Sequence, residues 1–232
     1  MIEGGSEMYR VEDTMTRIIN NAGENEAVIF TTPTGIFASI RNQPYMQLRQ
    51  INTRDIDMER IARVNQLSRA FAAGEMTLTQ LHRALVHLDT NIPYFPMWLQ
   101  IICSAVVSAL LMIVFTQTYT WGDLPLAGLT GAVGFVVAMY VRHLTKIKFI
   151  SELTGSFALA LTALVGVHLG LGQNLDNILI GGVMPLVPGV ALTNSIRDLL
   201  AGHLLTGLAR GTEAVLTACA IGFGIALVIS MA

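Results

Sequence analysis

The chain has 232 residues, of which 53% are hydrophobic and only 13% are charged, and its formal net charge is −2. Soluble domains carry roughly 25% charged residues, so this composition excludes an ordinary soluble protein and indicates a membrane protein. The sequence has no basic patch interleaved with aromatic residues, so we expect no nucleic acid among its partners.

The first 93 residues hold nine of the 14 Lys and Arg residues and are predicted to form a small α+β domain. Thr77 and Gln80 have the spacing of a capping box, which marks the start of a helix. The first helix is expected to cover one face of an antiparallel sheet, because a hairpin alone is marginally stable. The predicted elements are, in order, a helix over 6–22, strands over 26–32, 36–41 and 45–51, a helix over 57–73, and a helix that starts at Thr77 and ends near 91–93.

Residues 94–232 are predicted to form a membrane domain. A spanning helix needs about 20 apolar residues, and five segments meet this requirement. Glycines recur in them, and small residues let membrane helices approach closely. The segments are Met97–Thr116, Leu124–Val141, Phe149–Leu171, Ile178–Ile196 and Thr212–Met231. The fold class is therefore an α-helical membrane protein of about five transmembrane helices, preceded by the small α+β domain.

The fourth segment is predicted to be a broken helix. Pro185, Pro188 and Gly189 interrupt its centre, and proline removes a backbone donor and clashes with the preceding helical turn. Transporters build midplane sites from such broken helices. The alternative is a simple proline kink. The following residues, 197–211, are amphipathic and predict a helix lying in the membrane interface.

Lys and Arg near the ends of the segments predict the orientation. They occur in the loops after the second and fourth segments and are absent from the loops after the first and third. Positive residues concentrate on the cytoplasmic side. We therefore expect a multi-pass protein of the inner (plasma) membrane, with the N-terminal domain in the cytoplasm and the C-terminus on the far side.

Four blocks of sequence resemble the threonine/serine exporter family, in order along the chain. The blocks are Tyr9–Met15, Thr31–Phe37, Pro185–Asp198 and Gly207–Ala214. The chain is similar to the N-terminal, larger module of that family, and specifically to the large subunit of its split, two-chain form. The resemblance implies export of threonine and serine driven by the proton motive force, and a smaller five-span membrane subunit as partner. Some split pairs of the family are linked to dicarboxylates such as succinate.

The chemistry of these substrates selects candidate binding residues at the break. A carboxylate requires a cation or a helix N-terminus, and Arg197 is the arginine closest to the broken segment. Asp198 is able to hold an ammonium, carry a proton or pair with Arg197. The alternative is that both residues only mark the cytoplasmic end of the segment. The predicted substrate-binding residues are Pro188, Gly189, Thr193, Asn194, Ser195, Arg197 and Asp198.

Three acidic residues are candidates for proton coupling: Asp198, Glu152 and Glu213. For the two glutamates, which lie near predicted helix ends, solvation is the alternative. The chain has no metal-ligand spacing, and Thr31–Gly35 lacks the glycine pattern of a phosphate loop, so we expect neither metal nor cofactor.

Two other interpretations remain open. A dicarboxylate exporter subunit has the same architecture, and a membrane-anchored sensory or scaffold protein would use the N-terminal domain as its working part. A membrane-embedded enzyme is disfavoured, because no hydrolase motif is present. Expected partners are the smaller subunit, a small-molecule substrate and the lipid bilayer, and homo-oligomerisation is compatible with the sequence.

Overall fold

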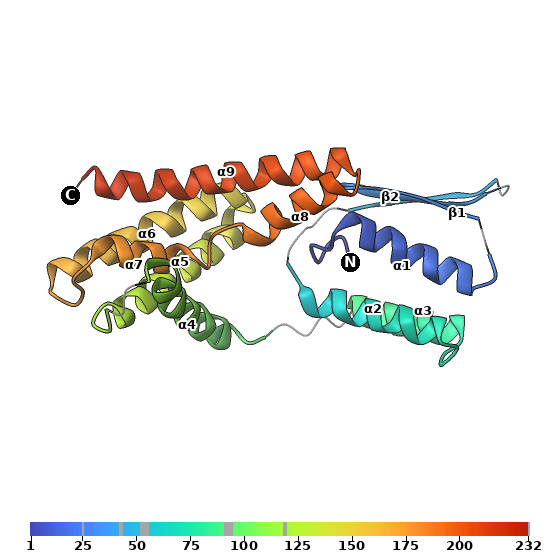
Figure 1. The fold of residues 1–232 in the computed structure, drawn as a ribbon, viewed down its shortest axis with the longest axis horizontal. Coiled ribbons are helices and arrows are strands. Elements are labelled where there is room, and N and C mark those ends of the chain that lie inside the picture. Colours follow the sequence, from blue (N-terminus) through green and yellow to red (C-terminus); the bar gives the residue numbers. More distant parts are fainter. Residues whose placement is uncertain (25, 42–43, 52–55, 91–94, 118–119, 232) are drawn as a thin grey trace. The chain divides into compact units, whose positions relative to one another are not determined.

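Figure 1 shows the computed structural model, which describes residues 1–24, 26–41, 44–51, 56–90, 95–117 and 120–231. The chain forms two compact units. The first unit comprises Met1–Pro93 together with Gly189–Thr212, and the second comprises Tyr94–Pro188 together with Glu213–Ala232.

The first unit contains the small α+β fold that the sequence predicts. Its elements are α1 (Met8–Asn21), β1 (Ala27–Thr32), β2 (Gly35–Ile40), β3 (Met46–Gln50), α2 (Met58–Ala72), α3 (Leu78–Thr90) and α8 (Gly189–Leu200), and it also holds the start of α9 (Leu204–Ile229). The three strands form one antiparallel sheet in the order β1-β2-β3. The expected end of α3 near 91–93 lies outside the described residues.

The helix α1 packs against the sheet, as predicted (Figure 1). Met8 and Val11 of α1 form a buried cluster with Ile2 and Ile51, and Ile36 of β2 packs on it. Apolar residues at helical spacing thus meet the inward-facing residues of the strands.

The capping box at the start of α3 is confirmed. The backbone N–H of Gln80 donates to Thr77 Oγ1 at 3.3 Å, and the backbone N–H of Thr77 donates to Gln80 Oε1 at 2.8 Å. These reciprocal bonds satisfy two amides that the helix itself leaves unpaired.

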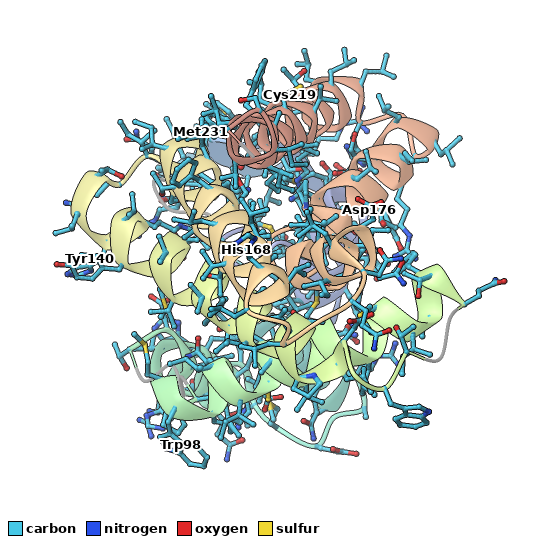
Figure 2. All side chains as sticks on the ribbon, turned by 90° about the vertical axis from the view of Figure 1, so that its left-hand side faces the viewer. Trp98, Tyr140, His168, Asp176, Cys219 and Met231 are labelled. Atoms are coloured by element: carbon cyan, nitrogen blue, oxygen red, sulfur yellow. The ribbon has the colours of Figure 1, made fainter. Side chains whose placement is uncertain are left out.

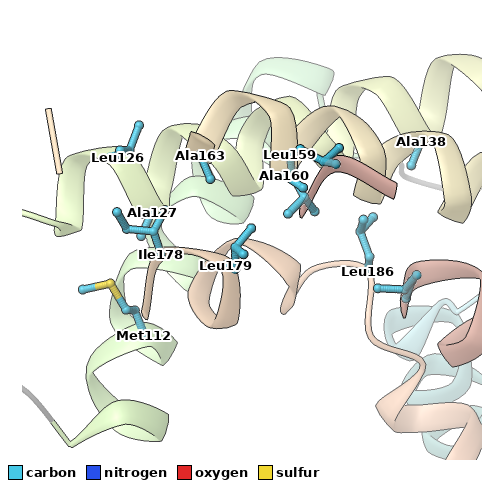
Figure 3. Close-up of a cluster of buried hydrophobic side chains, with 12 residues drawn as sticks. Met112, Leu126, Ala127, Ala138, Leu159, Ala160, Ala163, Ile178, Leu179 and Leu186 are labelled. Atoms are coloured by element: carbon cyan, nitrogen blue, oxygen red, sulfur yellow. The ribbon is translucent and has the colours of Figure 1, made fainter. Parts of the chain in front are cut away.

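The second unit is helical. It contains α4 (Met97–Thr116), α5 (Leu124–Thr145), α6 (Lys148–His168), α7 (Leu175–Val183) and the remainder of α9. The helix α5 packs against α4, α6 and α7. Figure 3 shows the apolar core of this unit, to which Met112, Leu126, Leu159 and Ile178 contribute from four different helices.

Four helices of the described chain are long and apolar enough to cross a membrane: α4, α5, α6 and α9. Large apolar and aromatic side chains on this unit point outward, among them Trp98 and Tyr140, which are 62% and 64% exposed (Figure 2). On α4 the exposed residues Ile102, Val106 and Leu110 recur every four positions and form one apolar stripe. Such a surface suits contact with lipid.

The fourth predicted segment is broken, as the prolines indicated. The helix α7 ends at Val183 and α8 begins at Gly189, so neither helix alone has the length of a span. Met184, Leu186 and Val187 donate their N–H groups to carbonyls three residues earlier, as in tight turns. Pro185 and Pro188 have no N–H with which to continue the helix.

The prediction of one interfacial helix over 197–211 is wrong, because α8 ends at Leu200 and α9 begins at Leu204. The chain turns between α8 and α9 at Gly202, whose φ of +89° favours glycine. The two ends of this segment therefore belong to different helices. The fifth predicted segment belongs to α9, which starts earlier than predicted, at Leu204. At 1.5 Å per residue its 26 residues reach about 39 Å, which exceeds the roughly 30 Å of a bilayer core.

Candidate functional site

Asp198 lies at the centre of a buried polar cluster in the first unit. Its side chain is fully buried. The backbone N–H of Met8 donates to Asp198 Oδ1 at 2.9 Å, and Arg210 Nη1 donates to Asp198 Oδ2 at 3.0 Å. Met8 is the first residue of α1, so Asp198 places a carboxylate at the N-terminus of that helix, where negative charge is favourable.

Arg210 completes the cluster. Its Nη2 atom donates to the carbonyl oxygen of Ser6 at 2.7 Å, and the residue is almost fully buried. Burial raises the pKa of Asp198 above its ordinary value, while the Met8 N–H and the Arg210 guanidinium oppose that shift. The pair thus joins α8, α9 and the residues that precede α1.

Arg197 does not pair with Asp198, which was one of the interpretations open from the sequence. Neighbouring residues on a helix point in different directions. Arg197 Nη1 instead donates to Glu7 Oε1 at 2.8 Å, and Arg10 Nη1 donates to Glu7 Oε2 at 3.2 Å. Burial acts to raise the pKa of Glu7, but its own backbone N–H, Arg197 and Arg10 together hold it below the ordinary value of 4.5.

Two further predicted residues join the same network. The Asn194 side-chain amide donates to the carbonyl oxygen of Gly5 at 2.8 Å, and the Ser195 hydroxyl donates to the carbonyl oxygen of Gly207 at 2.7 Å. Both residues are buried. They hold α8 against the segment before α1 on one side and against α9 on the other.

Thr193 and Arg197 differ from these buried residues because they are exposed. The Arg197 side chain is 56% exposed, and Thr193 lies on the exposed part of α8 with its hydroxyl donating to the carbonyl oxygen of Gly189 at 2.8 Å. Pro188 ends the first part of the second unit, and Gly189 begins α8. The structure therefore divides the predicted substrate-binding set into buried and exposed members.

Ser6, Glu7 and Arg210 were not among the predicted site residues. Ser6 contributes a backbone carbonyl, which no side-chain pattern reveals. Glu7 lies 190 residues from its partner Arg197, and Arg210 lies 204 residues from Ser6. Arg210 and Asp198 lie on opposite sides of a turn in a segment that was predicted to be one helix. One sequence pattern did point to this network: three of the four family-like blocks contain charged residues of opposite sign.

The two candidate glutamates lie in the second unit and have different surroundings. Lys148 Nζ donates to Glu213 Oε1 at 3.0 Å, and both side chains are partly buried. Glu152 on α6 is only 8% exposed, and its Oε2 atom is buried without a hydrogen-bond partner among the described residues.

The comparisons with known proteins agree with the residue blocks noted in the sequence. A family model described as "Putative threonine/serine exporter" matches residues 1–232. The "Probable threonine/serine exporter" of Mycobacterium tuberculosis (strain ATCC 25618 / H37Rv) is 25% identical over 229 residues, which are 97% of this chain and 43% of that protein. The chain thus spans less than half the length of this curated relative, and no solved structure matches it.

The family assignment and the four span-length helices describe the same kind of molecule, a multi-pass membrane protein of a transporter family. The resemblance that four short blocks suggested extends over the whole chain. This chain belongs to the threonine/serine exporter family.

Proposed function

We propose that the protein exports threonine and serine from the cytoplasm, and that the proton motive force drives this export. The observation that carries the proposal is the match of the entire chain to the exporter family, together with the name of the mycobacterial relative. The broken pair α7 and α8 supports it, because interrupted helices free backbone groups for a polar substrate.

Within α8, Arg197 and Thr193 are the residues that bind the substrate. Both are exposed, a guanidinium suits a carboxylate, and a hydroxyl suits the side chain of threonine or serine. The first N–H groups of α8, from Gly189 onward, have no intrahelical partner and favour an anion. Asn194, Ser195 and Asp198 position α8 through their buried hydrogen bonds.

We further propose that the protein lies in the inner membrane with residues 1–93 in the cytoplasm. The positive residues that support this orientation lie near the junction of α5 and α6 (Arg142, Lys146 and Lys148) and on α8 and the start of α9 (Arg197 and Arg210), whereas the loops after α4 and α6 have none.

The exporter includes a second, smaller membrane subunit. The region matched in the mycobacterial relative is 43% of its length, so that protein contains a further stretch beyond the part shared with this chain. We expect a partner subunit that supplies such a stretch to co-purify with this protein from native membranes. Recovery of an active exporter that contains only this chain contradicts the partner proposal.

Transport into proteoliposomes tests the substrate. The purified exporter is reconstituted, a pH gradient and a membrane potential are imposed, and the movement of radiolabelled threonine is followed in competition with unlabelled serine or succinate. Competition by serine and not by succinate is expected. Competition by succinate alone identifies a dicarboxylate exporter, and the absence of any flux supports the sensory or scaffold interpretation.

A further inference from the structure

We propose that Glu152 is the residue that binds and releases the proton coupled to export. This inference rests on the proposed function, because it assigns the coupling step of that transport cycle to one side chain. Glu152 lies on α6 in the second unit, together with Lys148 on α6, Arg142 on α5 and Glu213 on α9.

The burial of Glu152 fits a neutral carboxylic acid. The residue is 8% exposed and lies one turn inside a helix of membrane-spanning length. Its Oε2 atom is buried and has no hydrogen-bond partner among the described residues. An ionised carboxylate oxygen in that position loses its hydration without replacement, which costs far more than burying the neutral, protonated acid.

The two other candidates for proton coupling are already engaged. Both oxygens of Asp198 accept hydrogen bonds, from Met8 and from Arg210. One oxygen of Glu213 accepts a hydrogen bond from Lys148 at 3.0 Å. Of these three carboxylates, Glu152 is the one with a buried, unpartnered oxygen in the described structure.

The charged neighbours supply a partner for the ionised form. Lys148 lies four residues before Glu152 on α6, so the two side chains lie on the same face of the helix. Arg142 on α5 also acts electrostatically on Glu152 and has an interaction of its own. The flexible stem of Lys148 allows its ammonium to move from Glu213 to Glu152.

The coupling step follows from this geometry. The O–H bond of Glu152 breaks and the proton passes to cytoplasmic water. The ammonium of Lys148 then moves from Glu213 Oε1 to the new carboxylate. Protonation from the far side reverses the exchange. No oxidation or reduction takes place, and one proton enters the cell for each turn of this cycle while the substrate leaves.

The test is Glu152→Gln in the reconstituted exporter complex. Glutamine has the size of the neutral acid and cannot release a proton. We expect threonine efflux driven by a pH gradient to be lost, while exchange of labelled for unlabelled threonine at equal pH continues. The matched control is Glu75→Gln, which changes an exposed glutamate in the first unit and leaves both activities unchanged.

The outcomes separate this proposal from the proposed function. Wild-type vesicles without threonine flux contradict the proposed function itself. Wild-type flux together with full pH-driven efflux by Glu152→Gln overturns the role of Glu152. If the variant loses both activities, labelling of the wild-type complex with dicyclohexylcarbodiimide decides, because this apolar reagent reacts with protonated carboxyl groups. An adduct on Glu152 that diminishes as the pH rises supports the proposal, and the absence of that adduct overturns it.

Discussion

Asp198 Oδ1 accepts the backbone N–H of Met8 at 2.9 Å, although 190 residues separate the two in the chain. The other carboxylate oxygen binds Arg210, which also binds the carbonyl of Ser6. One side chain of α8 thus fixes the start of α1 and the first part of α9 within the same unit. Asp198, at the polar end of the segment that the two prolines interrupt, therefore connects three parts of the first unit.

Asp198→Ala is expected to destabilise the first unit severely. It leaves the buried Arg210 without its carboxylate, and breaking a buried pair in this way costs about 3–5 kcal/mol. Thermal unfolding of the purified protein in detergent measures the loss. The double variant Asp198→Leu with Arg210→Met is expected to recover part of it, because apolar replacement of a buried ion pair is often neutral. Equal destabilisation by the single and double variants contradicts this account.

Arg197→Ala is expected to abolish threonine export while the protein still reaches the membrane. Glu7→Gln is expected to have the opposite effect on binding, because it removes the carboxylate that now competes with the substrate for Arg197. The Arg197 side chain is 56% exposed, so solvent weakens this ion pair to about 0.2–1 kcal/mol, and the threonine concentration for half-maximal transport should fall about two- to fivefold in Glu7→Gln. Concentration-dependent uptake into vesicles measures both effects. Normal export by a folded Arg197→Ala protein excludes the site.

The hydrogen bonds of Glu7 also predict how stability depends on pH. Its pKa in the folded protein is held below 4.5, so the unfolded chain takes up a proton first as the pH falls. The stability that Glu7 contributes is therefore complete above 4.5 and is lost as the pH drops through the lower, folded value. Hydrogen exchange of the α1 amides between neutral and acidic pH measures this loss. In Glu7→Gln the acid-dependent part of the change should be smaller, and an unchanged profile contradicts the prediction.

Local chemistry made most of the fold predictable. The reciprocal bonds of Thr77 and Gln80 depend only on a three-residue spacing, and the break after Val183 depends on two prolines. Both features depend only on residues close together in the sequence, and both were predicted correctly. The turn at Gly202 was missed because leucines on its two sides continue an apparent helical period across it.

The partners of the candidate site residues were not predictable in the same way. Arg197 and Asp198 are adjacent, which suggested a mutual pair, yet each binds a residue from another element. Helical geometry explains why they do not pair with each other. It does not indicate which distant residue each one meets, because that depends on how the first unit packs.

Gly155 of α6 lies at a close contact between α5 and α6 in the second unit. A Cβ atom at this position would lie 2.7 Å from Ala138 Cβ and 2.8 Å from the carbonyl oxygen of Gly134, both on α5. These distances are shorter than any normal contact, and one of the two partners is backbone. The contact between α5 and α6 therefore requires glycine at this position.

Gly155→Ala is accordingly expected to force α5 and α6 apart and to destabilise the second unit by about 1–3 kcal/mol, the usual cost of overpacking. Gly222→Ala on α9 is the matched control, because a Cβ atom there meets nothing within 4 Å. Both changes gain helix propensity by up to about 1 kcal/mol, so the difference between them isolates the steric effect. Thermal unfolding in the same detergent measures that difference. Equal stability of the two variants would show that α5 and α6 do not approach each other this closely in the membrane.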